Sequence, residues 1–285
     1  VDDNVSVFAN TGYVEKPPIM DNVIYYDGTV ASDPLNESFI SSEAGVNFES
    51  EKFAVKVSAY NTDWKDRNLT KSVTTGQGSS GDTDVIFLKG IGQKHQGLEI
   101  EGSMKLNDIV RLDGAVSFGK WKFDGDADGL YTEYAEDAPK QTAYTYTLDG
   151  LYVGDQPQTA YVLGTTLTPM DGLRLQGIFK MYDKNYADWS PDSRELSGDA
   201  DRSQVWQAPA YNRLDLHAAY KLPKIAGYDM TLTGHLFNAL DAVYVQDAVD
   251  NSQYNGFGDK LHLAHNAEVF LGTPRYFNLG LSVNF

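Results

Sequence analysis

The chain alternates apolar and polar side chains over many short segments, and this pattern constrains its fold more than any other feature. The last nine residues show it most clearly, because Phe277, Leu279, Leu281, Val283 and Phe285 occupy every second position. Successive strand residues point to opposite faces, so these side chains form one apolar face. The residues between them are Asn, Gly and Ser. A strand that separates lipid from a polar lumen needs this arrangement.

Composition limits the classes of protein that fit. The 285 residues are 41% hydrophobic with a mean hydropathy of -0.40, and no apolar run approaches the ~20 residues of a membrane-spanning helix. A net charge of -17 repels phosphate groups, which argues against a nucleic-acid partner. The 18 Tyr and 13 Phe, with no Cys, suit a β-protein with aromatic girdles rather than disulfides. We predict an extended membrane structure without helical spans.

Alternating segments recur along the chain, and short turns join them into antiparallel pairs. About ten strands are predicted, over Val5 to Tyr13, Ser42 to Phe48, Phe53 to Trp64, Lys94 to Leu106, Val110 to Phe123, Thr159 to Thr168, Leu173 to Tyr182, Asn212 to Leu222, Met230 to Phe237 and 277 to 285. Trp121 is expected to mark an outer aromatic girdle.

Every second connection is long. The predicted loops of twenty or more residues are 67 to 92, 124 to 157, 184 to 209 and 246 to 272. Outer-membrane barrels have short periplasmic turns and long extracellular loops. The sequence therefore predicts an all-β, antiparallel transmembrane outer-membrane β-barrel, located in the outer membrane of a Gram-negative bacterium.

Three segments resemble TonB-dependent outer-membrane receptors. The segment His235 to Tyr244 contains L-F-N-A-L-D-A-V-Y and is similar to the family's N-L-F-(D/N)-x-x-Y. The segment Gly97 to Gly102 resembles G-(V/L)-E-(L/I)-E, and Tyr60 to Arg67 resembles Y-x-x-D-(W/Y)-x-(D/N)-R. The strand that ends at Phe285 resembles the closing strand that barrel-assembly machinery recognises. Their order matches the C-terminal portion of a receptor.

This resemblance implies that residues 1–285 are the C-terminal part of a 22-stranded barrel. The plug domain and the TonB box are not in this chain, and because it begins without a start methionine or signal peptide, we expect further N-terminal sequence. The implied partners are outer-membrane lipid, the remainder of the barrel and plug, the TonB complex and the barrel-assembly machinery. The implied function is energised uptake of a ferric chelate or an oligosaccharide, without catalysis.

Candidate ligand-binding residues are the aromatics of the predicted loops and the arginines that share the polar face of their strands. Aromatic rings stack on sugars or aromatic chelators, although they also pack loops together, and arginines attract anions, although they also pair with strand carboxylates. These candidates are Tyr131, Tyr134, Tyr144, Tyr146, Tyr152, Trp189, Trp206, Arg111, Arg174 and Arg213.

A possible cation site begins the second predicted loop. Asp124, Asp126 and Asp128 alternate as in a calcium loop, where hard carboxylate oxygens bind the ion. The twelfth position is Ala135 instead of the glutamate of an EF-hand. Calcium and a solvated acidic loop are therefore both open interpretations.

Two other functions compete with the receptor hypothesis. A self-contained small barrel would act as a passive pore. Asp215 and His217, on one strand face, together with Asp82 and Asp84, would instead resemble the catalytic groups of omptin proteases. The histidines at positions 262 and 265 are interpreted as solvated loop side chains.

Overall fold

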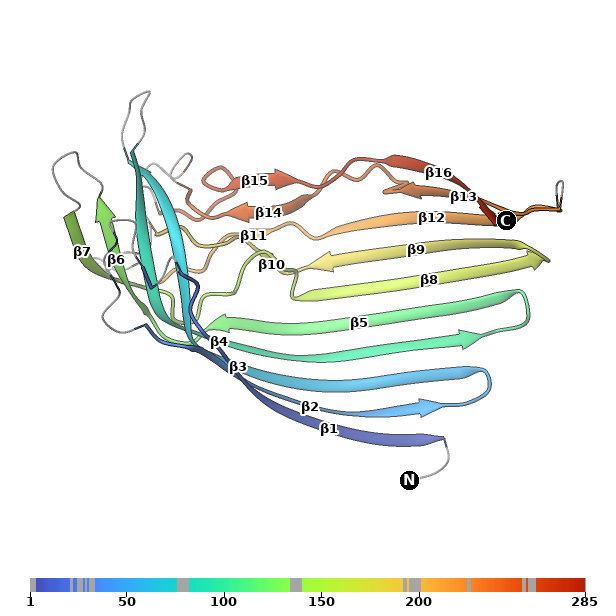
Figure 1. Ribbon diagram of the computed structural model, residues 1–285, viewed down its shortest axis with the longest axis horizontal. Coiled ribbons are helices and arrows are strands. Elements are labelled where there is room, and N and C mark those ends of the chain that lie inside the picture. The colour runs from blue at the N-terminus through green and yellow to red at the C-terminus, as the bar shows by residue number, and fades with distance from the viewer. Residues whose placement is uncertain are drawn as a thin grey trace.

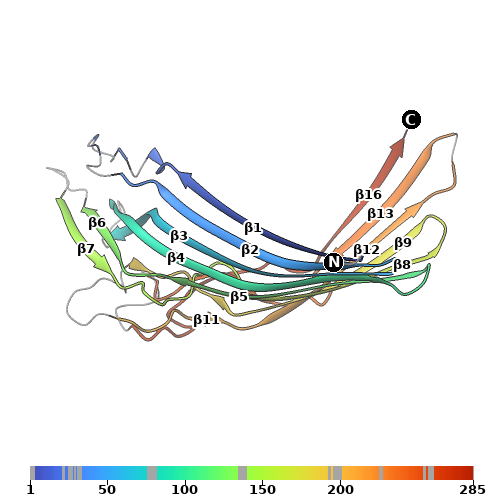
Figure 2. The same cartoon turned by 90° about the horizontal axis from the view of Figure 1, so that it is seen from below.

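The computed structural model describes residues 4–20, 23–24, 28, 30, 34–75, 82–133, 140–191, 194, 201–224, 227–252, 255 and 260–284. Ten antiparallel strands form the main path of a twelve-stranded sheet, from which two shorter strands branch, and this path curves like a section of a barrel wall (Figure 1, Figure 2). In sheet order they are β1 (Val5–Lys16), β2 (Glu37–Glu49), β3 (Phe53–Thr75), β4 (Asp82–Lys105), β5 (Val110–Phe123), β8 (Thr159–Met170), β9 (Leu173–Asp183), β12 (Tyr211–Lys221), β13 (Asp229–Phe237) and β16 (Tyr276–Asn284). Among the described strands, β1 and β16 are the two edges of this open wall.

Six shorter strands lie in the long connections at one end of the wall, at the left of Figure 1. They are β6 (Ala127–Glu133), β7 (Lys140–Tyr146), β10 (Asn185–Tyr186), β11 (Gln207–Ala208), β14 (Val245–Val249) and β15 (Glu268–Leu271). We call these strands, the segments between them and the adjoining ends of β3 and β4 the loop layer. The described part of the chain has no helix that is long and apolar enough to cross a membrane.

The predictions of about ten strands and of alternating short and long connections are confirmed. The short turns, all at the end opposite the loop layer, connect β2 to β3, β4 to β5, β8 to β9 and β12 to β13 (Figure 1). Since barrel proteins place their short turns in the periplasm, the loop layer is the extracellular end.

The prediction of a loop over residues 67 to 92 is wrong. β3 continues to Thr75 and β4 begins at Asp82, and cross-strand pairs such as Leu69 with Leu88 hold this hairpin together. The apolar run that contains Ile86 and Leu88 packs into the loop layer, which makes extended pairing favourable there. The glycine-rich residues 76–81 at its tip lie outside the described residues.

The convex face of the wall is apolar. Val46, Val57, Ile100, Val116 and Tyr161 are successive register partners on five neighbouring strands, so their side chains form one row across the sheet. Ile100 is 37% exposed although strands pair with β4 on both sides at this position. A row of exposed β-branched and aromatic side chains is stable only against another apolar medium, which for this wall is the lipid bilayer.

The final strand continues this apolar face. Phe277, Leu279 and Leu281 pair with β13 and are strongly exposed, with Leu279 at 74%. Val283 has the same strand parity, and Phe285 lies outside the described residues. Their proposed role as a barrel-assembly signal stays a prediction.

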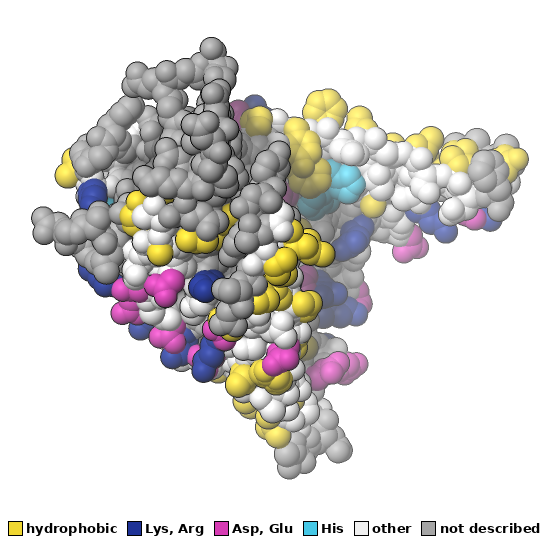
Figure 3. All heavy atoms as spheres, turned by 60° about the vertical axis from the view of Figure 1, so that its left-hand side comes forward, with side chains coloured by type: hydrophobic (Ala, Val, Ile, Leu, Met, Phe, Trp, Pro, Cys, Tyr) yellow, Lys and Arg dark blue, Asp and Glu magenta, His cyan; other side chains and the backbone are white. Residues whose placement is uncertain are grey.

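The loop layer has a core of its own. Its buried members include Trp189, Leu148, Leu151 and Tyr146, with Ile86 from β4. Figure 3, with the loop end turned forward, shows hydrophobic side chains beside interspersed Lys, Arg, Asp and Glu. The extracellular end is therefore packed like a water-soluble domain.

Candidate functional site

The concave face of the wall carries the charged residues of the strands. Lys56 on β3 lies between Glu43 and Glu101, whose carboxylate oxygens are 3.8 and 3.6 Å from its Nζ. Arg111 donates from Nε and Nη2 to Asp113 at 2.9 and 2.6 Å. In these pairs each charge is compensated by an opposite charge, so the inner face can line a water-filled lumen.

Trp121 belongs to this inner face, so the prediction that it marks an outer aromatic girdle is wrong. It is the register partner of His95, with ring centroids 5.5 Å apart, and its Nε1 donates to Tyr60 Oη at 2.8 Å. A polar partner on the lumen side satisfies the indole N–H better than lipid would.

Three tyrosines stack where β9 and β12 reach the loop layer. Tyr182 and Tyr211 are cross-strand partners with ring centroids 5.1 Å apart, and Tyr244 stacks on Tyr211 at 4.4 Å and 18°. Arg213 donates from Nη1 to Tyr244 Oη at 2.7 Å, and its guanidinium carbon is 5.4 Å from the centre of that ring. We call these four residues the aromatic mouth.

A buried carboxylate fixes the arginine of the aromatic mouth. Asp215, whose side chain is 3% exposed, accepts from Lys180 Nζ and from the backbone N–H of Asn238, both at 2.9 Å. Its Oδ2 is 3.9 Å from Arg213 Nη2. Two cations therefore face one carboxylate, and the excess charge at the mouth is positive, which favours an anionic ligand.

The arrangement suits a flat, electron-rich ligand. Stacked rings offer aromatic faces, and a guanidinium supplies charge-assisted hydrogen bonds to oxygen anions. Sequence reasoning selected Arg213 but missed Tyr182, Tyr211 and Tyr244. The available signal was strand parity, because Tyr211 precedes Arg213 by two residues and Tyr182 follows Lys180 by two.

The loop tyrosines and tryptophan that were predicted to bind a ligand do not belong to the aromatic mouth. Tyr146 and Trp189 are buried with ring centroids 5.9 Å apart, and Tyr144 packs between Tyr131 and Tyr146 at 6.2 and 6.5 Å. Tyr134 lies outside the described residues. These rings form part of the loop-layer core, and Trp189 at 1% exposure offers almost no surface to a ligand.

The remaining aromatic candidates are partly accessible. Tyr152 stacks on Tyr186 at 4.2 Å, and Lys122 Nζ lies 4.5 Å from the centre of the Tyr152 ring. Trp206 is half-buried, and its backbone N–H donates to Asp250 at 3.2 Å. Burial raises the pKa of Tyr186 to about 12, so its hydroxyl stays protonated. Ligand contact by Tyr152 and Trp206 stays a prediction.

Of the three predicted arginines, Arg111 and Arg174 line one hollow of the inner face, and Arg213 lies outside it. Arg111 lies near a short turn and binds Asp113. Arg174 lines a hollow of the inner face together with Gln176 and Phe237. Only Arg213 reaches the aromatic mouth.

The aspartates of the proposed calcium loop have other partners. Asp126 binds Arg202 through both carboxylate oxygens at 2.6 and 2.7 Å, which lowers the pKa of Asp126. Asp124 lies 3.7 Å from Lys94, and Asp128 accepts from Thr145 at 3.1 Å. Within the described ranges, no three His, Asp or Glu side chains are gathered to hold a metal ion. Calcium stays a prediction, and it would require Asp126 to release Arg202.

A buried ion cluster joins distant segments of the loop layer. Arg194, fully buried, lies 3.4 Å from Asp250 and donates to the carbonyl oxygen of Ser203 at 2.7 Å. His262 bridges two carboxylates, with Nδ1 2.5 Å from Asp250 and Nε2 2.6 Å from Asp201. We call Arg194, Asp201, Asp250 and His262 the ion clamp.

The interpretation of His262 as a solvated loop side chain is therefore wrong. Burial disfavours the charged imidazole, but the hydrogen bonds to Asp250 and Asp201 outweigh it, and the pKa of His262 is raised above its ordinary value. Both ring nitrogens donate to carboxylates in this charged form. His265 is exposed, as expected.

The groups proposed for a protease are engaged elsewhere. Asp215 binds Lys180 and the backbone of Asn238, whereas His217 pairs with His235 across β12 and β13. The side chains of Asp82 and Asp84 lie outside the described residues. This geometry gives no support to an Asp-His catalytic pair.

Comparison with protein families decides between the remaining hypotheses. The family model described as "TonB dependent receptor-like, beta-barrel" matches residues 1–239. The chain belongs to this family. TonB-dependent receptors are outer-membrane proteins of Gram-negative bacteria, so the predicted location and barrel fold are confirmed. The family consists of receptors and transporters, which agrees in general terms with the expectation of a non-enzymatic protein.

Solved structures of TonB-dependent receptors share the fold of this chain. The copper transporter OprC superposes with a TM-score of 0.61 at 15% identity, covering 99% of this chain and 37% of its own. The siderophore receptor PiuA from Acinetobacter baumannii gives 0.61 at 15% identity, covering 100% and 34%. The ferric preacinetobactin receptor BauA from the same organism gives 0.56 at 19% identity, covering 100% and 35%. The chain thus spans about a third of these receptors.

A comparison with curated proteins gives no matching sequence.

Proposed function

We propose that this chain forms the C-terminal wall of a TonB-dependent importer and that the aromatic mouth binds a ferric chelate. The observation that carries the proposal is the Tyr182, Tyr211 and Tyr244 stack joined to Arg213 on the lumen side. Ferric chelators present oxygen anions and, in the catecholate class, aromatic rings, which match a guanidinium and stacked tyrosines. The siderophore receptor PiuA and the ferric preacinetobactin receptor BauA share this fold, which supports this ligand class.

In this proposal the ligand enters from the loop layer and meets the aromatic mouth first. A plug domain within the lumen, supplied by the remainder of the polypeptide, would then rearrange through energy from the TonB complex. The convex apolar face would contact outer-membrane lipid, and the barrel-assembly machinery would recognise the final strand. This chain would supply the binding wall and leave energy coupling to the other parts.

The test is transport of iron by cells that depend on the natural polypeptide carrying this chain. Uptake of radioactive iron is measured with a catecholate, a hydroxamate and a carboxylate chelator, with and without a protonophore. Replacing Arg213 with Gln removes a charge-assisted bond, so affinity for the transported chelate should fall roughly 10- to 100-fold. Uptake of that chelate should also stop with the protonophore.

Arg111→Gln is the matched control, because this arginine shares the inner face but lies near a short turn. It should leave uptake unchanged. An oligosaccharide ligand would need the rings but not the guanidinium, so loss of glycan uptake in Tyr211→Ala with no effect of Arg213→Gln would replace the ferric chelate with a sugar. Unchanged uptake of every probe in both variants would refute the binding role of the mouth.

A further inference from the structure

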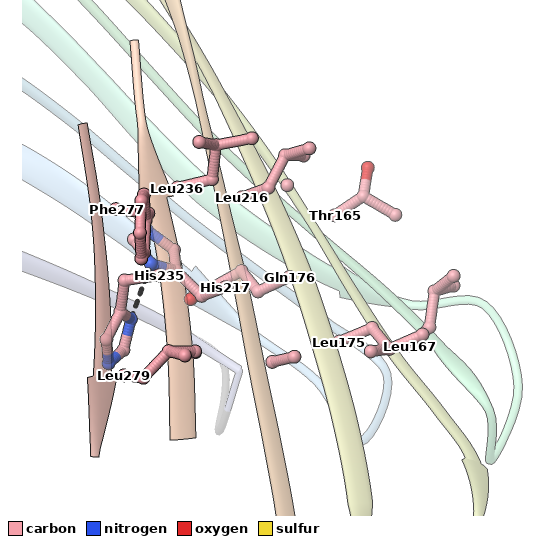
Figure 4. Close-up of a pocket in the computed structure, with 13 residues that line it drawn as sticks. Thr165, Leu167, Leu175, Gln176, Leu216, His217, His235, Leu236, Phe277 and Leu279 are labelled. Carbon is pink, nitrogen blue, oxygen red and sulfur yellow. Dashed lines mark hydrogen bonds between the residues drawn. The ribbon is translucent and has the colours of Figure 1, made fainter. Parts of the chain in front are cut away.

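Two histidines on the inner face of the wall are placed as a pair. His217 on β12 and His235 on β13 are direct register partners, and their Nδ1 atoms are 2.9 Å apart. Figure 4 shows the two rings meeting across the strands, with a dashed line between the nitrogens. In Figure 3 a group of histidine side chains lies on the hollowed side of the sheet, near Lys and Arg. Nothing in the proposed chelate-binding mouth uses this pair.

The Nδ1 lone pairs of these two histidines can bind a metal ion. Two neutral imidazoles at this distance share one proton, with one Nδ1 donating and the other accepting. A metal ion can be bound by both Nδ1 atoms once the donor's proton moves to its own Nε2, so that both imidazoles stay neutral. With metal–nitrogen bonds of about 2.05 Å, nitrogens separated by 2.9 Å subtend roughly 90° at the metal.

That angle is compatible with a known class of metal complexes. A right angle is the cis angle of square-planar and octahedral complexes, whereas tetrahedral zinc would need a separation of about 3.3 Å. Imidazole suits Cu(II) and Ni(II), and Cu(II) binds most tightly in the order of divalent ions. The imidazole donors and the order of affinities therefore favour Cu(II), followed by Ni(II).

The surroundings leave the other coordination positions open. The two histidines line a hollow of the inner face with Arg174, Gln176 and Phe237. Among the residues that the structure describes, no third His, Asp or Glu completes a metal-binding group with them. The nearby Asp215 already binds Lys180. A bare divalent ion would lack negative protein ligands here, and Arg174 adds positive charge to the hollow.

We infer that His217 and His235 form a two-histidine site that binds Cu(II) or Ni(II) carried by an anionic chelator. The chelator supplies the negative ligands and occupies the remaining metal positions, and the imidazoles take two adjacent ones. Arg174 compensates the negative charge of the chelator from the same hollow. The two imidazoles thereby hold the chelated metal on the wall of the lumen.

The probe is Cu(II) iminodiacetate, which leaves adjacent positions free for two imidazoles. The purified natural polypeptide that carries this chain is titrated in detergent and followed by electron paramagnetic resonance. The expected result is one bound complex per chain with a two-imidazole signature. His217→Gln and His235→Gln should each lower the affinity on the order of 100-fold, since a two-point attachment becomes a one-point attachment.

His265→Gln is the matched control, because this histidine is exposed in the loop layer, and it should bind like the wild type. A second measurement needs no variant. Diethyl pyrocarbonate modifies accessible imidazoles, and Cu(II) iminodiacetate should protect His217 and His235 but not His265.

Equal binding by wild type and both glutamine variants would overturn the inference, as would failure to protect the pair in the unmodified protein. A pair that only links two strands would retain its fold in the variants and show no two-imidazole copper signal. These results do not depend on iron uptake, so the histidine site and the aromatic mouth can fail independently.

Discussion

The wall and the loop layer of this protein are built for different surroundings. In the wall, apolar side chains such as Ile100 and Leu279 face outward, while Lys56 and its carboxylate partners lie inside. In the loop layer, Trp189 is buried, and the charged groups of the ion clamp are paired with one another. The strands of the wall therefore expose their apolar side chains to lipid, whereas the loop layer buries them as a water-soluble protein does.

The largest expected effect comes from the ion clamp. Asp250→Ala leaves the buried Arg194 without its main carboxylate, and breaking a buried ion pair in this way costs about 3–5 kcal/mol. Hydrogen exchange of loop-layer amides in the natural polypeptide should accelerate accordingly, while wall amides stay protected. Asp108→Ala, which removes an exposed partner of Lys105, is the control and should change neither region. Acceleration confined to the wall would contradict the separation of the two regions.

Reversing the polarity of the wall should have the next largest effect. Ile100→Arg places a cation against lipid, at a cost of about 2–4 kcal/mol near the membrane midplane. Glu99→Arg, one residue away on the lumen face, should cost much less because water reaches it. Urea unfolding in lipid vesicles measures both variants. Equal losses would show that the two faces do not differ in their surroundings.

A smaller loss is expected where backbone and ring are in close contact inside the wall. A Cβ atom on Gly97 would lie 2.5 Å from Tyr60 Cζ, so Gly97→Ala must displace a ring that accepts the Trp121 hydrogen bond. Overpacking of this kind costs about 1–3 kcal/mol. At Gly12 a Cβ atom meets nothing within 4 Å, and Gly12→Ala is the matched control. Thermal unfolding in detergent should separate them, and equal midpoints would be inconsistent with the described packing.

The smallest expected effect is a dependence of the loop layer on pH. The pKa of His262 is raised above 6.5, so its stabilisation is complete below that value and is lost as pH rises through the folded pKa. Burial, followed by the hydrogen bond to Asp247, raises the pKa of Asp155 from 3.8 to about 7. This contribution has the same sign, because the folded state binds more protons than the unfolded state between those values.

Loop-layer exchange, corrected for the intrinsic rate, should therefore accelerate as pH rises from about 5 to 9. His262→Gln should flatten the upper part of this dependence and Asp155→Asn the part below about pH 7. Slower corrected exchange at alkaline pH would reverse the sign and disprove the account of both groups.

The wall could be predicted from the sequence because the alternation of apolar and polar residues within each strand shows which side chains face lipid. Alternation from Leu98 to Met104 already specifies which side meets lipid, and the register partner does not alter this. The aromatic mouth could be predicted only in part, since Tyr211 and Arg213 share a strand face but Tyr244 arrives from a distant segment.

The loop layer could not be predicted in the same way. The residues at 86 and 88 read as part of a polar loop, yet a core formed with Trp189 and Leu148 turns that segment into strand. The role of His262 depends on carboxylates 12 and 61 residues away in the sequence. Local patterns carry no information about such contacts.

The orientation of the wall in the outer membrane can be measured directly by cysteine labelling. The chain contains no cysteine, so single cysteines can be introduced at Val243, which is 83% exposed and lies between β13 and the loop-layer strand β14, and at Asn107 in a short turn. Intact cells are treated with a membrane-impermeant maleimide. If the loop layer is extracellular and the short turns are periplasmic, Val243→Cys is labelled in intact cells and Asn107→Cys only after the outer membrane is permeabilised. Labelling of Asn107→Cys alone in intact cells would contradict this orientation.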